Sequence, residues 1–203
     1  INHMMENKWL GSKTKQGFYK KVDKDILSLD LETLEYRSAK KASFQTLELT
    51  KTIDKVVDRF KVLVKGKDKA GEFYRKSFAG LFAYVSNRVP EITDDLYKID
   101  DAMKAGFGWE HGPFQIWDAI GVDKALEFMN EIGEKPAAWV QEMLDSGNKS
   151  FYTVKEGVNY YYDITSKFQK KIPGQDAFII LDNIRDTKKV WGNAETSLFD
   201  LGD

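Results

Sequence analysis

The segment Ala105–Gly121 has the glycine spacing of a ligand-binding loop. Its Gly106-x-Gly108-x-x-x-Gly112 pattern is one residue longer than the Gly-x-Gly-x-x-Gly pattern that cradles a dinucleotide phosphate. Such a cradle follows a strand, whereas this segment follows a helical pattern, and Pro113 removes an amide where a phosphate needs one. The sequence therefore favours a folding corner over a nucleotide loop.

A run of carboxylates precedes this corner, at Glu91, Asp94, Asp95, Asp100 and Asp101. On a single helix, Glu91 shares a face with the residues three and four positions later. Paired carboxylates bind hard cations or do acid–base work. The alternative is a solvated helix face opposite the apolar stripe, which is the usual place for such a run.

Two polar pairs complete the candidate chemistry. His111 follows Glu110, and a histidine beside a carboxylate can act as a general base; the alternative is an exposed loop histidine. Asn87-Arg88 ends a helix rich in aromatic residues. Arg88 can hold a phosphate or form a structural ion pair with the acidic residues that follow it.

The bulk composition limits the classes of function. The 203 residues carry a formal net charge of −1 with the signs mixed along the chain, so no positive field is present to hold nucleic acid or an acidic membrane surface. The chain has no cysteine, which excludes disulfides, zinc–thiolate sites and thiol chemistry. Its apolar runs are too short to span a membrane. We expect a cytoplasmic protein without a metal site.

Apolar spacing predicts a mainly helical domain that positions these residues. Asp68 is the predicted N-cap of the second helix, Pro90 a break or kink after it, and Gly106 the C-cap of the third. The predicted helices cover residues 47–64, 68–89, 91–104, 114–120, 122–132 and 136–144.

The glycine-rich corner is expected to turn at Gly108 and Gly112, and Pro113 is expected to start a short helix. Its aromatic residues, Phe107, Trp109, Phe114 and Trp117, are expected to pack into the core. Residues 151–163 predict a β-hairpin around a glycine turn. Residues 8–41 are interpreted as an irregular tail or linker in which residues 26–36 form a short strand or a turn, and residues 178–203 as strand-like or irregular.

Three stretches resemble one enzyme family. Residues 9–20, WLGSKTKQGFYK, resemble the closing motif of the helical C-terminal domain of 3-hydroxyacyl-CoA dehydrogenases. Residues 89–121 resemble the core of a second copy of that domain, although a histidine at position 111 departs from the pattern. Residues 193–203 resemble the linker before an enoyl-CoA hydratase/isomerase domain in fused β-oxidation proteins. The second-copy motif contains Gly106, Gly108, Gly112, Pro113, Phe114, Trp117 and Asp118.

The resemblance implies a mainly α fold of the 3-hydroxyacyl-CoA dehydrogenase C-terminal type with a small β-rich extension. It assigns residues 6–46 to the tail of a first helical copy and a linker, and residues 47–146 to the second copy. Residues 147–203 become an extension or linker towards a missing downstream domain. Residues 1–5, Ile-Asn-His-Met-Met, are expected to be a vector remnant.

By the same resemblance, the chain is the central fragment of an NAD-dependent (S)-3-hydroxyacyl-CoA dehydrogenase of fatty-acid β-oxidation. NAD would bind a missing Rossmann domain, and the fragment would carry no cofactor and no catalytic residue. Asn87 and Arg88 stand where an Asn-Arg pair of the first copy contacts the substrate region, so they are the candidate acyl-CoA contacts. Without its first copy, the fragment is expected to expose an apolar face and to form a homodimer or to self-associate weakly.

Two other interpretations remain open. In one, the domain is a purely structural module between two enzymes and contacts no acyl-CoA. In the other, it is a free-standing carboxylate enzyme that uses Glu91, Asp94 and Asp95. Acyl-CoA binding by variants of Asn87 and Arg88 tests the first interpretation, and turnover by the isolated chain tests the second.

Overall fold

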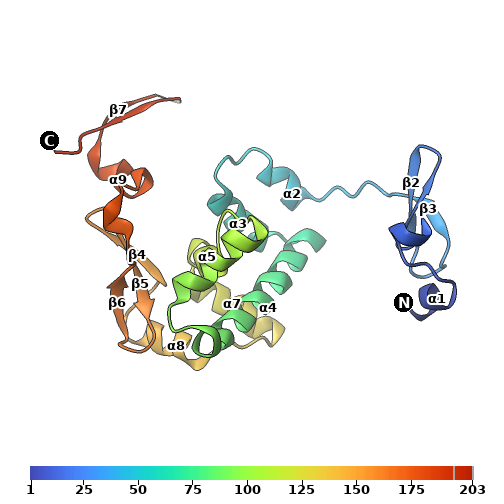
Figure 1. The fold of residues 1–203 in the computed structure, drawn as a ribbon, viewed down its shortest axis with the longest axis horizontal. Helices are drawn as coiled ribbons and strands as arrows, with labels where there is room; N and C mark the ends of the chain where they lie inside the picture. The colour runs from blue at the N-terminus through green and yellow to red at the C-terminus, as the bar shows by residue number, and fades with distance from the viewer. Residues whose placement is uncertain (194, 203) are drawn as a thin grey trace. The chain divides into compact units, whose positions relative to one another are not determined.

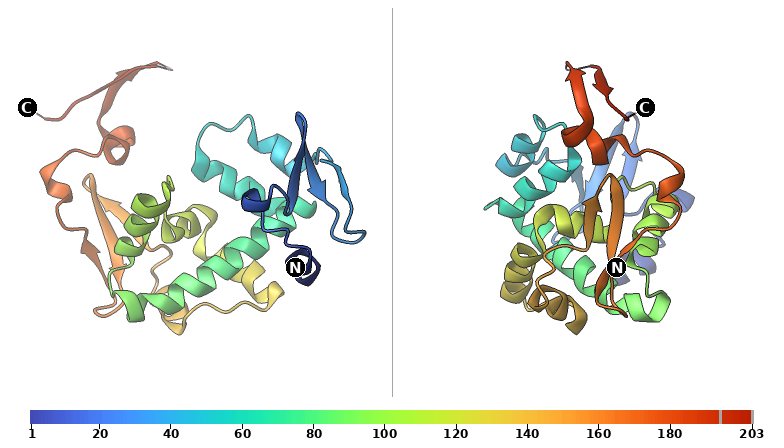
Figure 2. Two further views of the ribbon diagram at one scale, coloured as in Figure 1. Left: turned by 45° about the vertical axis from the view of Figure 1, so that its right-hand side comes forward. Right: turned by 90° about the vertical axis from the view of Figure 1, so that its left-hand side faces the viewer.

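The computed structural model describes residues 1–193 and 195–202 of the chain. Ala194 and Asp203, which belong to the predicted extension and to the linker motif at 193–203, lie outside the described residues. Internal contacts divide the chain into two compact units, one formed by Ile1–Ser43 and one that begins at Phe44. In Figures 1 and 2 the first unit is blue, and the second runs from cyan to red.

The first unit is a small antiparallel sheet, which corrects the prediction of a mostly irregular tail, although β2 falls partly within the short strand or turn predicted at residues 26–36. Its tight turns use positive φ values at Asp23 and Leu34, so the glycine that usually marks such a turn is missing from the sequence. The apolar stretches of this unit are short. Among its described residues, Met4 and Leu29 are the buried apolar side chains. Its elements are α1 (Asn2–Glu6), the 3-10 turn η1 (Ser12–Thr14), β1 (Tyr19–Val22), β2 (Asp25–Leu29) and β3 (Tyr36–Ser38), with sheet order β1-β2-β3.

The second unit is mainly helical, which confirms the expected fold class. Its helices in the described range are α2 (Gln45–Thr50), α3 (Val56–Lys65), α4 (Lys69–Ile92), α5 (Leu96–Phe107), α6 (Pro113–Ile120), α7 (Val122–Ile132), α8 (Ala138–Asp145) and α9 (Leu181–Lys188). Its β part holds a three-stranded antiparallel sheet, the 3-10 turn η2 and a two-stranded pair. These are β4 (Tyr152–Lys155), β5 (Val158–Asp163), β6 (Phe168–Lys171), η2 (Gln175–Ala177), β7 (Lys189–Gly192) and β8 (Ser197–Phe199).

The helical spacing over residues 47–64 belongs to two helices, α2 and α3, rather than to the single helix predicted. The β-branched residues Thr50, Thr52 and Ile53 lie at the break and lower the helix propensity there. The carbonyl of Ile53 instead accepts a hydrogen bond from Arg59 Nε at 2.6 Å. The resulting change of direction lets both short helices pack on α4.

Helix α4 is the longest helix of the described chain, and its start confirms Asp68 as the N-cap. Asp68 Oδ1 accepts the amide of Gly71 at 3.0 Å. The same carboxylate accepts the amide and the hydroxyl of Thr46 at 2.9 and 2.8 Å, which ties the start of α2 to the start of α4. None of the helices in the described residues combines the length and apolar character that crossing a membrane requires.

Pro90 does not break α4, so the predicted break at this residue is wrong. The helix continues through Pro90 to Ile92. A proline cannot donate to the carbonyl one turn earlier, here that of Ser86, and Trp139 Nε1 of α8 donates to this oxygen at 2.9 Å. The Ser86 hydroxyl also accepts the amide of Ala137 at 3.0 Å. The proline therefore creates an attachment point for the start of α8.

Helix α5 begins and ends later than predicted. Residues 93–95 connect it to α4, and Thr93 Oγ1 accepts the amide of Asp95 at 3.1 Å. Its C-cap is Gly108 at φ 65°, while Gly106 lies inside the helix. Glycine tolerates this left-handed backbone without strain. Phe107 in the last turn is 74% exposed, so its predicted packing into the core is also wrong.

The remaining elements are mostly as predicted. Pro113 starts α6, Gly133 at φ 86° follows α7, and β4 pairs antiparallel with β5 across Glu156-Gly157. The exceptions are β6, which was not predicted, and α9, which lies in the segment interpreted as strand-like or irregular. Its Asp182 is in the first turn and pairs with Arg185 at 2.9 Å, and both features stabilise a helix.

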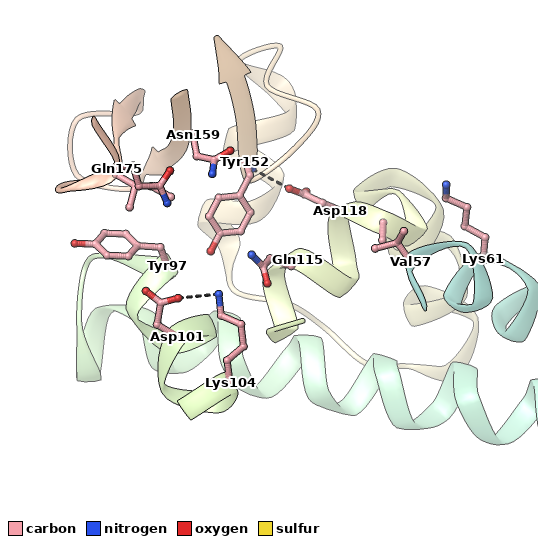
Figure 3. A pocket seen from close by; sticks show the side chains of 12 residues that line it. Val57, Lys61, Tyr97, Asp101, Lys104, Gln115, Asp118, Tyr152, Asn159 and Gln175 are labelled. Atoms are coloured by element: carbon pink, nitrogen blue, oxygen red, sulfur yellow. Dashed lines mark hydrogen bonds and ion pairs between the residues drawn. The ribbon is translucent and has the colours of Figure 1, made fainter. Parts of the chain in front are cut away.

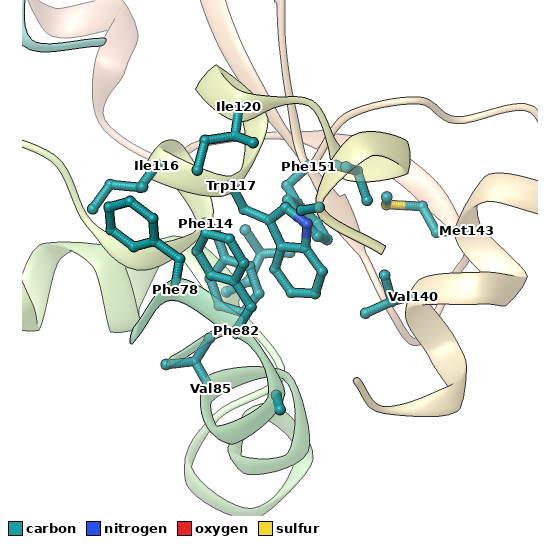
Figure 4. Packing of buried hydrophobic residues seen from close by; sticks show 14 of the residues in the cluster. Phe78, Phe82, Val85, Phe114, Ile116, Trp117, Ile120, Val140, Met143 and Phe151 are labelled. Carbon is teal, nitrogen blue, oxygen red and sulfur yellow. The ribbon is translucent and has the colours of Figure 1, made fainter. Parts of the chain in front are cut away.

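Helices α3 to α8 and the sheet β4–β6 share one hydrophobic core (Figure 4). Phe82 of α4 stacks on Trp117 of α6 with ring centroids 4.6 Å apart. Phe151, just before β4, packs against Phe114 and Trp117 at centroid distances of 5.0 Å. Trp109 is partly buried against the same cluster. Stacked and edge-on ring pairs add to the stability from buried area, and here they join the sheet to the helices.

Candidate functional site

Gly112 marks a close approach between α5 and α6. Its φ of −78° is open to any residue, so the absence of a side chain serves packing rather than the tight turn expected from the sequence. A Cβ at this position would overlap both backbone and side chain of Asp100. The Gly112 amide donates to Gln115 Oε1 at 3.0 Å, which closes the start of α6.

Alanine substitutions at Gly112 and Gly106 should have opposite effects. We expect Gly112→Ala to lower the free energy of unfolding by about 2 kcal/mol, because α5 and α6 must separate to relieve the overlap. We expect Gly106→Ala to raise it by about 0.5 kcal/mol, because Gly106 is inside a helix, where an added Cβ meets no atom within 4 Å. Urea denaturation measures both, and equal changes would contradict this account of Gly112.

Asp100 is buried, although the sequence suggested a solvated acidic face. The residue is 1% exposed. Its Oδ1 accepts the amide of Phe114 at 2.9 Å, and its Oδ2 accepts the amide of Gln115 at 3.1 Å and the hydroxyl of Tyr152 at 2.8 Å. Burial raises the pKa of Asp100 to about 6, and these hydrogen bonds oppose the rise. The carboxylate thus caps the first turn of α6 from the neighbouring helix.

The first turn of α6 does not fit a dinucleotide phosphate. A phosphate at a helix start needs free backbone amides. Here the amides of Phe114 and Gln115 donate to Asp100, and that of Gly112 donates to Gln115. Pro113 has no amide hydrogen. The glycine-rich corner is therefore a helix–helix joint, as the sequence context indicated.

Asp118 of α6 holds the beginning of the sheet. Its Oδ1 accepts the amide of Phe151 and its Oδ2 accepts the amide of Tyr152, both at 2.8 Å. Burial raises the pKa of Asp118 to about 7; the two hydrogen bonds lower it, and the charge of Asp100 raises it further. The family motif included this residue, but the sequence did not indicate its partners.

Tyr152 connects Asp100 and Asp118, which together we call the buried acid pair. Its amide donates to Asp118 and its hydroxyl to Asp100. Burial, together with the charges of both acids, raises the pKa of Tyr152 well above its usual range. The hydroxyl therefore remains a donor, and one residue of β4 links α5 to α6.

A cavity of about 420 Å³ lies beside the buried acid pair. In Figure 3, Lys104 of α5 and Gln115 of α6 face Tyr152, while Asn159 and Gln175 lie on the sheet side. Lys104 pairs with Asp101 at 2.8 Å, and both oxygens of Asp118 are bound to amides. The groups that line the cavity are thus suited to hydrogen bonding with a ligand more than to proton transfer.

The predicted acidic run does not form one helix face. Glu91 lies in the last turn of α4 and pairs with Arg88. Asp95 precedes α5 and accepts the Tyr161 hydroxyl at 2.5 Å and the Lys98 ammonium at 2.8 Å. The hydrogen bond from Lys98, followed by that from Tyr161, lowers the pKa of Asp95. Within the described part of the chain, no three His, Asp or Glu side chains are grouped as a metal ion requires.

His111 packs against the helical core. Its ring meets that of Phe60 edge-on at 6.2 Å, and Glu110 Oε1 lies 3.7 Å from its Nε2. Neither His111 nor Glu110 lines the 420 Å³ cavity. The geometry therefore favours a packing role for this histidine over that of a general base.

Asn87 and Arg88 make contacts within their own helix. Asn87 Nδ2 donates to the carbonyl of Ala83 at 2.8 Å. Arg88 pairs with Glu91, and its guanidinium lies over the Tyr84 ring at 5.7 Å. These contacts match the structural alternative for Arg88. Contact between the two residues and acyl-CoA stays a prediction.

Comparisons with known proteins point to one family. Residues 73–161 match the family model described as 3-hydroxyacyl-CoA dehydrogenase, C-terminal domain. The chain is 39% identical over 204 residues to the "Probable 3-hydroxyacyl-CoA dehydrogenase" of Bacillus subtilis (strain 168), an alignment covering 100% of this chain and 26% of that protein. It is 26% identical over 208 residues to the "Putative fatty acid oxidation complex trifunctional enzyme" of Rickettsia felis (strain ATCC VR-1525 / URRWXCal2), covering 98% of this chain and 25% of that protein. The chain thus spans about a quarter of the length of these relatives. No solved structure matches it.

Proposed function

We propose that the chain is the central piece of an NAD-dependent (S)-3-hydroxyacyl-CoA dehydrogenase of fatty-acid β-oxidation, since its residues 73–161 match the model of that family's C-terminal domain. The observation that carries the proposal is the 39% identity to the Bacillus relative along the whole chain. The proposal includes a cytoplasmic location and a hydratase-like domain downstream. The printed name of the Rickettsia relative, a trifunctional enzyme, supports the latter.

In this proposal NAD binds a dinucleotide-binding domain that precedes residues 1–203. The start of α6 is not a phosphate site for this cofactor, because its amides donate to Asp100 and Gln115. NAD would accept the hydride in the whole enzyme. In this proposal, the role of this chain is to pack on the substrate side of the enzyme and to pair with another helical domain.

One face of α4 supports the pairing role. Phe73 and Tyr84 are 63% and 64% exposed. Gly80 lies seven residues after Phe73 and four before Tyr84, so all three residues are on one face of the helix. A Cβ at Gly80 would meet no atom within 4 Å, so a helix of a first helical copy can approach closely. Exposed apolar surface of this kind attracts a partner.

We expect the isolated chain to self-associate through this face of α4. Light scattering should give a mass that rises with concentration towards that of a dimer. Phe73→Asp and Tyr84→Asp should abolish the rise, because each places a charge in the apolar contact. Phe107→Asp, at an exposed aromatic residue of α5, is the matched control and should leave it unchanged. A monomeric mass of the unmodified chain at high concentration would count against the pairing role.

Calorimetry with acetoacetyl-CoA on the longer protein tests the acyl-CoA contact. We expect Asn87→Ala and Arg88→Ala each to weaken binding by about tenfold, since each removes a polar contact to the substrate. Asn130→Ala, at an exposed asparagine of α7, should have no effect. The Arg88–Glu91 pair favours the second candidate function, a purely structural inter-domain module. Unchanged binding in both variants would select that candidate.

A further inference from the structure

The 420 Å³ cavity beside the buried acid pair has the size of a small-molecule site. Ligand pockets are commonly about 300–1,000 Å³, whereas protein interiors are otherwise close-packed. Its walls come from α3, α5, α6, the β4–β5 hairpin, Ile172 after β6, and η2, all within the unit that begins at Phe44. The chemistry of these walls indicates what the cavity can bind.

Gln115 presents a hydrogen-bond donor to the cavity in a fixed orientation. Its Oε1 accepts the Gly112 amide at 3.0 Å, so turning the side-chain amide over would lose that bond. Nε2 is therefore the group left for the cavity, and Figure 3 shows it facing Tyr152. The helix side of the cavity thus supplies an N–H that is held in place by the capping of α6.

Gln175 supplies an acceptor on the opposite side. Its Oε1 is buried and has no hydrogen-bond partner among the described residues. A buried acceptor without a partner is costly, and native proteins ordinarily satisfy such a group. Gln175 lines the cavity on the sheet side, as does Asn159. The two glutamines therefore provide one donor and one acceptor for the same ligand.

The charged groups around the cavity compensate one another. Lys104 pairs with Asp101 at 2.8 Å, and Lys61 pairs with Asp58 at 2.9 Å. Both oxygens of Asp118 accept backbone amides. An ion brought into this space would meet no free counter-charge and would lose its hydration. The apolar part of the wall consists of Val57, Ala119 and Ile172.

We propose that this cavity binds a neutral molecule that carries a secondary amide on a short aliphatic chain. A carbonyl oxygen of the ligand accepts from Gln115 Nε2, an N–H of the ligand donates to Gln175 Oε1, and the aliphatic part lies against Val57 and Ile172. The binding groups all belong to this chain, so the proposal stands whether or not the longer protein is a dehydrogenase. Two sources share this chemistry, a pantetheine arm and a small peptide amide.

NMR on isotope-labelled residues 1–203 tests the proposal with two probes, pantetheine and N-acetylglycine N-methylamide. We expect shifts of the Gln115 side-chain amide and the Gly112 backbone amide that saturate with added probe. Tighter binding of pantetheine assigns the first source, and tighter binding of the peptide amide assigns the second. Pantothenate, which carries an amide and a negative charge, should bind at least about fivefold more weakly than pantetheine.

Two variants separate a built site from a chance contact. Gln115→Glu keeps an oxygen for the Gly112 amide but removes the donor, and Gln175→Met removes the acceptor at similar size. We expect each to weaken binding of the tighter probe by about tenfold. Gln141→Met, at an exposed glutamine of α8, is the control and should bind like the unmodified chain. Absence of saturable shifts with both probes, or unchanged affinity in both folded variants, would overturn the proposal.

Discussion

Replacing Asp100 with alanine should lower the free energy of unfolding of the second unit by about 4 kcal/mol. The substitution leaves the amides of Phe114 and Gln115 and the hydroxyl of Tyr152 without their acceptor. Each unsatisfied buried donor costs about 1–3 kcal/mol, and the space left by the carboxylate adds to the loss. Urea denaturation followed by circular dichroism measures the change.

The neighbouring acid provides the control for this experiment. Asp101 is exposed, and its contact in the described structure is a surface pair with Lys104. Asp101→Ala should therefore change the free energy of unfolding by no more than about 0.5 kcal/mol. Asp100→Asn should fall between the two alanine variants, because the amide keeps one acceptor but turns a second donor towards the backbone. Equal losses in Asp100→Ala and Asp101→Ala would refute the role given to Asp100.

The second unit should become less stable as the pH rises from about 5 to about 8. The pKa of Asp100 is raised to about 6 and that of Asp118 to about 7, from an ordinary value of 3.8. The folded state therefore keeps protons that the unfolded state has lost. This contribution is complete below the unfolded pKa and is lost as the pH rises through the folded values. A shift of two to three units corresponds to about 3–4 kcal/mol, and we expect a loss of that order.

A pH series of thermal unfolding curves measures this dependence. Asp118→Asn removes one of the titrating groups and should flatten the decline above about pH 6. Asp95→Asn is the contrasting variant. The pKa of Asp95 is lowered by Lys98 and Tyr161, so its contribution is present above the unfolded pKa and is lost only as the pH falls below it. A flat profile of the unmodified chain from about pH 5 to about pH 8 would contradict the assignment.

The predictable part of the fold is the part with regular apolar spacing. The wide aromatic face of α4 and the stripe of α7 identified their helices, and the glycine turn at Gly157 identified the β4–β5 hairpin. The turns at Asp23 and Leu34 lack glycine, so the small sheet of the first unit left no such signal. A proline is ordinarily a stop signal, and nothing near Pro90 in the sequence indicated that Trp139 would take the freed carbonyl.

The site was less predictable than the fold because its interactions are distant in sequence. In sequence, Asp100 resembles its exposed neighbour Asp101. Its burial depends on Gly112, which has no side chain, and on Tyr152, which lies 52 residues further along the chain. The cavity depends on five or more separate elements. The glycine spacing of residues 106–112 and the resemblance of residues 89–121 to a family motif pointed to this corner, but neither indicated what Asp118 binds.

Because the chain is synthesised from its N-terminus, the donors to the buried acid pair become available at different times. The amides of Phe114 and Gln115 leave the ribosome 14 and 15 residues after Asp100, to which they donate. The donors to Asp118, by contrast, emerge 33 and 34 residues after it, and the hydroxyl of Tyr152 emerges 52 residues after Asp100. Domains are generally folded from the N-terminal end during synthesis. The newly made helices therefore carry two acids with an incomplete set of hydrogen bonds until Phe151 and Tyr152, at the start of the sheet β4–β6, have been synthesised.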